Sequence, residues 1–197
     1  MKHYLMVDLG TGNSRVALVD SDGGILGLRT YTNVYHRDSA YEDGQYFLPE
    51  DWAALLLQGC RELCREHPDV QVNAVSAAGA RQSFVLLDGN GRAFLGLPNI
   101  DNRGRAYMAQ VPEHDEIYRL SGKWATEDFG AAKLLGLRMQ HPEQYEAVES
   151  VLSLSEWIAW IFTGRKVMEY TQACESQLYD IGQRSWSQTL CSFYGLR

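Results

Sequence analysis

The sequence contains no long hydrophobic run. Stretches such as Trp157–Phe162 are far shorter than the roughly 20 apolar residues that a helix needs to cross a bilayer. The first residues enter a strand-like apolar pattern directly, without the charged and hydrophobic regions of a signal peptide. We therefore expect a cytoplasmic protein with no membrane partner.

Basic residues are also in the minority. Lys and Arg total 18 against 25 Asp and Glu, which gives a formal net charge of −7. This balance argues against nucleic acid or an anionic membrane as the main partner. A small phosphorylated ligand remains compatible with it, because such a ligand needs positive charge only locally.

Cysteine and histidine are few and show no metal-ligand spacing. Cys60 and Cys64 are four residues apart, which is helical spacing, and the other two cysteines, Cys174 and Cys191, are isolated. We expect reduced, partly buried thiols. The five histidines are scattered, so the sequence contains no metal cluster and no pairing of a nucleophile with histidine.

The most informative segment is the N-terminus. An apolar run that begins at Tyr4 ends in Asp8, and a turn of small residues at 10–14 leads into a second apolar run that begins at Val16. This pattern predicts a β-hairpin with Asp8 at the tip of a strand. Small turn residues let backbone N–H groups approach an anion, and a neighbouring carboxylate can hold a divalent cation or its water. A nucleotide phosphate and its metal would suit this arrangement, whereas the alternative is an ordinary Asx-type turn.

The first half of the chain predicts three antiparallel strands followed by a helix. The strands are expected over residues 4–9, 15–19 and 25–34. The polar segment 36–46 is expected to be a loop. Pro49 and the two acids after it begin the helix, which ends near His67-Pro68. Its apolar stripe consists of Trp52, Leu55, Leu56, Cys60 and Leu63.

The second half predicts a buried central strand at 70–78 and then a hairpin, a mostly helical region, a strand and a helix. These later elements are expected over 84–97, 104–148, 151–154 and 156–162. The order matches half of a ribonuclease-H-like (actin-type) ATPase domain. We therefore expect an α/β fold whose mixed sheet begins with three antiparallel strands and has helices on both faces.

Several motifs resemble those of the FGGY family of carbohydrate kinases. Asp8-x-Gly10-Thr11-x-x-x-Arg15 resembles the family's first phosphate-binding motif, and Asp101-x-Arg103 resembles its W-x-D-x-R segment. The resemblance continues along the whole chain. Further matching stretches are Ala74–Ser76 with Val85–Gly91, Trp157-Ile158 with Thr163-Gly164, Tyr170-x-x-Ala173, and Asp180 with Trp186.

The resemblance implies transfer of the γ-phosphoryl group of ATP to a hydroxyl of a small sugar or polyol, with Mg²⁺. Asp8 would hold Mg²⁺ or its water. Thr11, Gly12 and Asn13 would donate hydrogen bonds to phosphate oxygens. Arg15 would offset developing negative charge.

A second candidate site is Gly79-Ala80-Arg81-Gln82-Ser83, which follows a strand. Arg81 can donate two parallel hydrogen bonds to neighbouring hydroxyls, and Gln82 can both donate and accept. Glycerol kinases have Arg-Glu at the matching positions and xylulose kinases have Met-His, so this chain departs from both patterns. The alternative is a loop arginine without a ligand.

A third candidate is Asp101, in the segment Asn99-Ile-Asp101-Asn-Arg103. Sugar kinases usually have tryptophan where Asn99 stands, and this pattern is more similar to the autoinducer-2 kinases. Asp101 could accept a hydrogen bond from a substrate hydroxyl. The alternative is an internal ion pair of Asp101 with Arg103 or Arg105 that shapes the loop.

The resemblance covers only the front of such an enzyme. We expect residues 1–197 to form one N-terminal sugar-binding domain with a hairpin and helical insert around 83–148. The C-terminal ATP-binding domain and the catalytic base, an aspartate in this family, would lie beyond Arg197, so the catalytic residue is unknown and the chain alone should be inactive. The expected partners are the sugar and ATP, and a homodimer is compatible with them. A non-catalytic actin-like module that binds a nucleotide or a partner is the alternative function, and a chaperone-type ATPase is a third.

Overall fold

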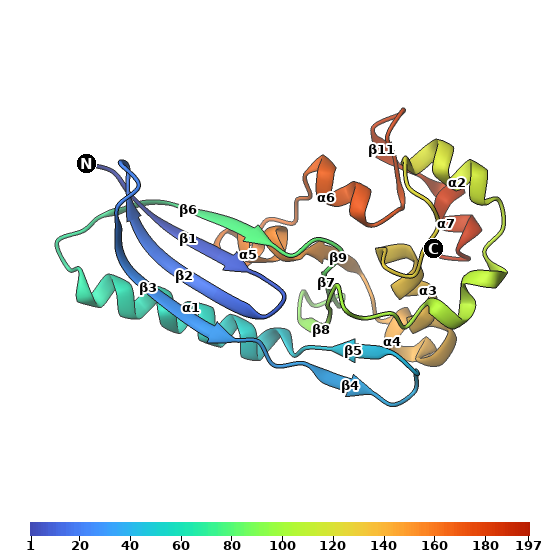
Figure 1. Ribbon diagram of the computed structural model, residues 1–197, viewed down its shortest axis with the longest axis horizontal. Helices are drawn as coiled ribbons and strands as arrows, with labels where there is room; N and C mark the ends of the chain where they lie inside the picture. Colours follow the sequence, from blue (N-terminus) through green and yellow to red (C-terminus); the bar gives the residue numbers. More distant parts are fainter.

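The computed structural model describes residues 1–197 (Figure 1). Its strands are β1 (His3–Leu9), β2 (Asn13–Asp20), β3 (Ile25–Thr32), β4 (His36–Asp38), β5 (Gly44–Tyr46), β6 (Val72–Gly79), β7 (Phe84–Leu87), β8 (Ala93–Leu97), β9 (Ser150–Ser153), β10 (Tyr179–Asp180) and β11 (Ser185–Trp186). Its helices are α1 (Pro49–Glu66), α2 (His114–Ser121), α3 (Gly130–Gln140), α4 (Pro142–Glu146), α5 (Leu154–Thr163), α6 (Tyr170–Glu175) and α7 (Gln188–Phe193), with a 3₁₀ helix η1 (Arg105–Gln110). No helix is long and apolar enough to span a membrane.

The main sheet has the strand order β3-β2-β1-β6. The first three strands are antiparallel and β6 runs parallel to β1, which confirms the expected start of a mixed sheet. The expectation of a buried central strand at 70–78 was wrong, because β6 lies at the edge of the sheet and most of its residues are exposed. Apolar residues alternate along β1, so that Leu5, Val7 and Leu9 share one buried face, as the two-residue period of a strand requires. Because β1 and β6 are parallel, both end at the same edge of the sheet, where β3 also ends.

Helix α1 covers the buried face of the sheet and confirms the predicted helix. It begins at Pro49 with two acids in its first turn and has Arg65 in its last turn, which suits the helix dipole. Trp52, Leu56 and Leu63 are buried on one stripe with the face of β1. The boundary at Glu66 agrees with the end that Pro68 predicted.

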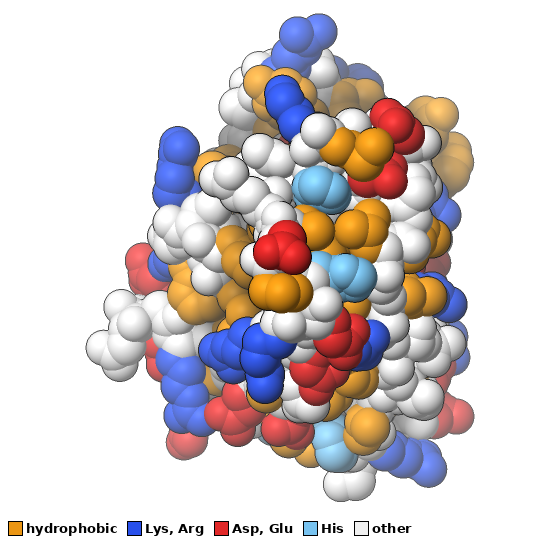
Figure 2. Space-filling model, turned by 90° about the vertical axis from the view of Figure 1, so that its left-hand side faces the viewer, with side chains coloured by type: hydrophobic (Ala, Val, Ile, Leu, Met, Phe, Trp, Pro, Cys, Tyr) orange, Lys and Arg blue, Asp and Glu red, His pale blue; other side chains and the backbone are white.

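Ion pairs connect the polar side of α1 to the sheet. Arg29 on β3 donates to the carboxylate of Glu62 at 2.9 Å and also contacts Glu66. Figure 2 views the end of the molecule near the N-terminus, and there basic and acidic side chains lie beside one another. Positive charge is therefore interrupted by acids on this face.

Helix α5 packs on the same face of the sheet as α1. Its Trp157 and Ile158 are buried in one cluster with Val7, and Ala77 of β6, which pairs with Val7, packs against this cluster. Among the described residues both helices that pack on this sheet therefore lie on one face. The α/β fold is confirmed, but the expected cover of both faces is not found here. The opposite face leaves Met6 40% exposed.

A second, three-stranded sheet has the order β8-β7-β9. The hairpin of β7 and β8 and the strand β9 confirm three predicted elements, and β9 pairs with β7 in antiparallel register. The expected helical region contains η1, α2, α3 and α4. These helices pack with β7 and β8 around a second hydrophobic cluster that includes Ile117, Leu135 and Tyr194.

Segment 36–46 was expected to be a loop, and this expectation was wrong. It forms a short antiparallel hairpin in which His36 pairs with Tyr46, and their rings stack with centroids 5.1 Å apart. Each strand has only three residues, too few for a recognisable alternation of polar and apolar residues.

Candidate functional site

The turn between β1 and β2 carries the first group of predicted residues. Asp8 and Arg15 face each other across the two strands, and Arg15 Nη1 donates to Asp8 Oδ2 at 3.2 Å. Their side chains are 49% and 46% exposed. The pair therefore lies open to a ligand, and its own contribution to stability is small.

The backbone of the turn has two unused donors. The N–H groups of Thr11 and Gly12 make no hydrogen bond within the protein, and a Cβ added at Gly12 would meet no atom within 4 Å. Asn13 begins β2, and its side chain makes no hydrogen bond. An anion can therefore approach these amides closely. We call residues 10–13 the phosphate loop, after the role that the resemblance predicts.

The second predicted site begins where β6 ends. Gly79 pairs with Leu9 of β1, and the N–H of Ala80 donates to the carbonyl of Leu9 at 2.7 Å. A Cβ at Gly79 would lie 2.6 Å from Cβ of Leu154, so only glycine lets β6 pass α5 this closely. This contact fixes the direction of the segment that follows. We call residues 80–83 the sugar loop, again after the predicted role.

The side chains of the sugar loop are free to bind. Arg81 is exposed, and neither it nor Gln82 makes a side-chain hydrogen bond or an ion pair. Gln82 has a φ of 59°, in the left-handed region. A non-glycine residue there stores about 1–3 kcal/mol of strain, and such residues cluster at ligand sites.

Asn99 connects the two loops, a role that sequence reasoning missed. Its side-chain nitrogen lies 3.0 Å from the hydroxyl oxygen of Thr11, and its backbone N–H donates to the hydroxyl of Ser83 at 2.9 Å. The structure therefore brings the phosphate loop and the sugar loop together at one end of the sheet. Ligands of α/β sheets commonly bind outside the carboxyl ends of the strands.

Asp101 lies outside this exposed site, and its expected role as a substrate ligand stays a prediction. Its side chain is completely buried, with one oxygen accepting from the N–H of Gln45 at 2.9 Å and the other from Arg103 Nε at 2.8 Å. Burial raises the pKa of the Asp101 carboxyl, which the Arg103 guanidinium opposes. The alternative of an internal ion pair with Arg103 is what the structure contains.

Lys133 is a second feature that sequence reasoning missed. It lies on α3 with a fully buried side chain and donates to the carbonyls of Pro98, at 2.9 Å, and Asp101. Burial lowers the pKa of the Lys133 ammonium to about 8. A lysine within the apolar run Ala131–Leu135 was the available signal, because buried lysines are rare unless they have partners. Lys133 fixes the segment that carries Asn99.

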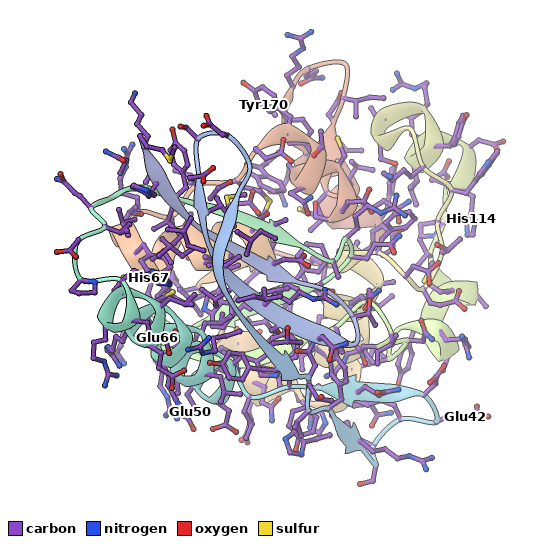
Figure 3. The ribbon with its side chains drawn as sticks, turned by 60° about the vertical axis from the view of Figure 1, so that its left-hand side comes forward. Glu42, Glu50, Glu66, His67, His114 and Tyr170 are labelled. Atoms are coloured by element: carbon purple, nitrogen blue, oxygen red, sulfur yellow. The ribbon has the colours of Figure 1, made fainter.

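The Asp8 carboxylate fits the expected role in holding Mg²⁺. Its second oxygen has no partner in the protein, and Mg²⁺ usually takes one or two carboxylates together with water and substrate phosphates. No group of three or more His, Cys, Asp or Glu side chains could enclose a metal by itself. Figure 3 shows the histidines His67 and His114 on opposite sides of the molecule.

Curated relatives match nearly the whole chain. The sugar kinase YoaC of Bacillus subtilis (strain 168) is 38% identical over 195 residues, which are 98% of this chain and 40% of YoaC. The autoinducer-2 kinase of Salmonella choleraesuis (strain SC-B67) is 29% identical over 99% of this chain and 38% of its own length. The chain thus spans about two fifths of the length of these relatives.

Solved structures share the fold. A xyloylose kinase from Brucella ovis superposes with a TM-score of 0.88 at 20% identity, over 98% of this chain and 41% of that protein. A Plasmodium falciparum glycerol kinase with ADP superposes with a TM-score of 0.80 at 15% identity, over 98% of this chain and 41% of that protein.

The family profile described as "FGGY family of carbohydrate kinases, N-terminal domain" matches residues 3–197. That match spans both loops of the site and the fold that positions them. The chain belongs to the FGGY family of carbohydrate kinases.

Proposed function

We propose that residues 1–197 are the sugar-binding N-terminal domain of an ATP-dependent carbohydrate kinase, in which the segment around 83–148 is an insert. The enzyme would transfer the γ-phosphoryl group of ATP to a hydroxyl of a small sugar or polyol. One observation carries the proposal: Asn99 joins the phosphate loop to the sugar loop, at distances of 3.0 and 2.9 Å. A transferred group and its acceptor must meet in one place.

The phosphate loop would bind the end of the triphosphate. The free N–H groups of Thr11 and Gly12, with the side chain of Asn13, would donate to phosphate oxygens. Arg15 would offset the negative charge that develops on the transferred group. Bound Mg²⁺, held by Asp8 through water, would neutralise phosphate charge.

The sugar loop would orient the acceptor. The Arg81 guanidinium has five donors in a fixed plane and can hold two neighbouring hydroxyl oxygens, while the Gln82 amide both donates and accepts. Both side chains are free of internal partners, so binding does not break hydrogen bonds within the protein.

The rest of the reaction would come from a second domain. It would supply the adenine site and the aspartate base that deprotonates or orients the hydroxyl. The 197-residue chain alone would therefore show no turnover. Since ATP is the cosubstrate, we propose the cytoplasm as the compartment. A homodimer is part of the same proposal, and light scattering of the full-length protein measures it.

The test uses the full-length enzyme with ATP, Mg²⁺ and a panel of glycerol, ribulose, xylulose and the autoinducer-2 precursor, chosen from the relatives. We expect transfer to one of them. Arg81→Ala should raise the KM for that sugar about 10-fold or more, because hydrogen bonds to charged groups contribute about 1.5–3 kcal/mol. The KM for ATP should change little.

Arg92→Ala is the matched control, since Arg92 lies in the turn before β8 and its side chain is 70% exposed. Equal kinetics for the Arg81 and Arg92 variants would exclude the sugar loop as the acceptor site. ATP binding without transfer to any sugar would instead favour a non-catalytic module.

A further inference from the structure

Three carbonyl groups of the phosphate loop, those of Gly10, Thr11 and Gly12, are held from one side. The Asn33 side-chain nitrogen donates to the carbonyl of Gly10 at 2.7 Å, and the Asn33 backbone N–H donates to that of Gly12 at 3.1 Å. The carbonyl of Thr11 accepts from the Tyr35 hydroxyl at 2.6 Å and from Asn33 at 3.2 Å. The segment just after β3 thus binds three consecutive carbonyls.

This arrangement sets the direction of the free amides. In a planar trans peptide, the C=O of one residue and the N–H of the next point in opposite directions. Holding the carbonyls of Gly10 and Thr11 toward Asn33 therefore turns the N–H groups of Thr11 and Gly12 away from it. These are the two amides that lack a partner in the protein.

Asn33 is itself held in one orientation. Its side-chain oxygen accepts from the hydroxyl of Ser14 at 2.6 Å, and Ser14 is buried in β2. The side chain at this position must both donate and accept a hydrogen bond. An amide does both, whereas a carboxylate only accepts and an alkyl side chain such as that of alanine does neither.

Tyr35 is anchored to the hydrophobic core. Its ring packs edge-on against Trp52 with centroids 5.7 Å apart, and Trp52 stacks on Phe47 at 4.1 Å. A phenol is protonated at neutral pH and can donate its hydrogen, and burial raises the pKa of the Tyr35 phenol further. The carbonyl of Thr11 is thus connected through Tyr35 to aromatic residues of the hydrophobic core.

We propose that Asn33 and Tyr35 are positioning residues that preorganise the phosphate loop for the anionic end of the nucleotide. The inference deepens the proposed function and rests on it. Neither residue touches the ligand, because both act through the loop carbonyls. Preorganised donors bind an anion without a reorganisation cost at the moment of binding.

The test compares Asn33→Ala, Tyr35→Phe and a control in the full-length enzyme. Tyr35→Phe removes one hydroxyl and should raise the KM for ATP about 2- to 10-fold, while Asn33→Ala removes several hydrogen bonds and should raise it further. The KM for the sugar should stay within about 2-fold of wild type. The control is Asn73→Ala, because Asn73 lies at the opposite end of the sheet, where it accepts from the N–H of His3 at 2.9 Å. It should leave both KM values unchanged.

A second measurement does not depend on turnover. Isothermal titration of the 197-residue chain with inorganic pyrophosphate and Mg²⁺ should show weaker binding for Asn33→Ala and Tyr35→Phe than for Asn73→Ala. Unchanged ATP kinetics and pyrophosphate binding in folded Asn33 and Tyr35 variants would overturn the inference, and so would an equal rise of both KM values. A wild-type protein that binds pyrophosphate but phosphorylates no sugar would overturn only the proposed function. A wild-type chain that binds no pyrophosphate would overturn both.

Discussion

Replacing Asp101 by asparagine tests whether this carboxylate holds the fold together or binds substrate. Asp101→Asn keeps the shape of the side chain but removes its charge and places a donor group beside Arg103. Both side chains are buried, with 0% and 1% of their surface exposed. Removing one partner of a buried ion pair costs about 3–5 kcal/mol, because the other charge loses its compensation. Arg103 would keep one longer carboxylate contact, between its Nη1 and Asp38 Oδ2 at 3.7 Å.

This loss of stability is large enough to measure by thermal unfolding. For a chain of 197 residues, 1 kcal/mol shifts the melting temperature by about 2–4 °C, so Asp101→Asn should melt about 6–20 °C below wild type. The control is Asp69→Asn, since Asp69 is exposed and makes no hydrogen bond. It should change the free energy of unfolding by less than about 0.5 kcal/mol.

Two results would contradict the structural role. The first is that Asp101→Asn melts at the same temperature as the Asp69→Asn control. The second is that Asp101→Asn keeps full stability while the full-length enzyme that carries it loses affinity for its sugar. A double variant adds a further check. Asp101→Leu with Arg103→Met removes both charges, and it should lose less stability than the sum of the two single variants.

Three further changes test the geometry elsewhere. Gln82→Gly relieves a left-handed conformation that costs about 1–3 kcal/mol, but it adds about 0.5–1 kcal/mol of chain entropy to the unfolded state. The melting temperature should therefore stay the same or rise while the KM for the sugar increases, and a clear fall in melting temperature would refute the strain. Gly79→Ala should lower the free energy of unfolding by about 1–3 kcal/mol in urea titrations, because its Cβ would lie 2.6 Å from Leu154. Burial raises the pKa of the Cys60 thiol to about 11, so its thiolate forms only at higher pH than that of an ordinary thiol. Iodoacetamide at pH 9 should therefore label the exposed Cys64 and leave Cys60 unlabelled until the protein unfolds.

Elements with a clear periodicity could be predicted from the sequence. The alternation in β1 and the stripe of α1 gave their position and their buried faces, because both elements pack on one continuous core. The exception is Leu55, which was expected in the stripe of α1 and is 36% exposed. The hairpin of β4 and β5 could not be predicted, since its three-residue strands are polar and depend on pairing between His36 and Tyr46.

The candidate site was predictable in part. Asp8 and Arg81 follow apolar strands, and the sequence therefore placed them at strand ends. Asp101 also lies in a polar segment after a strand, yet its burial depends on Arg103, on the backbone of Gln45 and on the position of Lys133. Such contacts join segments far apart in the chain, and no local pattern encodes them.

The residues that hold the loops were missed for a related reason. Asn33 and Asn99 are ordinary polar residues near strand ends, where asparagine is common for its turn conformation alone. The partners of Asn33 lie 19–23 residues away in the sequence, and those of Asn99 lie 16 and 88 residues away. Only the three-dimensional arrangement distinguishes them from turn residues.

The outer edge of β6 has a consequence for handling this chain. β6 pairs with β1 on one side only, and its residues Val72–Gly79 include no charged side chain and no proline, the usual means by which an unpaired strand avoids joining another. Its row of open backbone donors and acceptors is a template for any extended polypeptide, a second molecule included. Concentrated solutions of the 197-residue chain should therefore self-associate through this strand, and added salt should promote it by screening the repulsion between molecules of net charge −7.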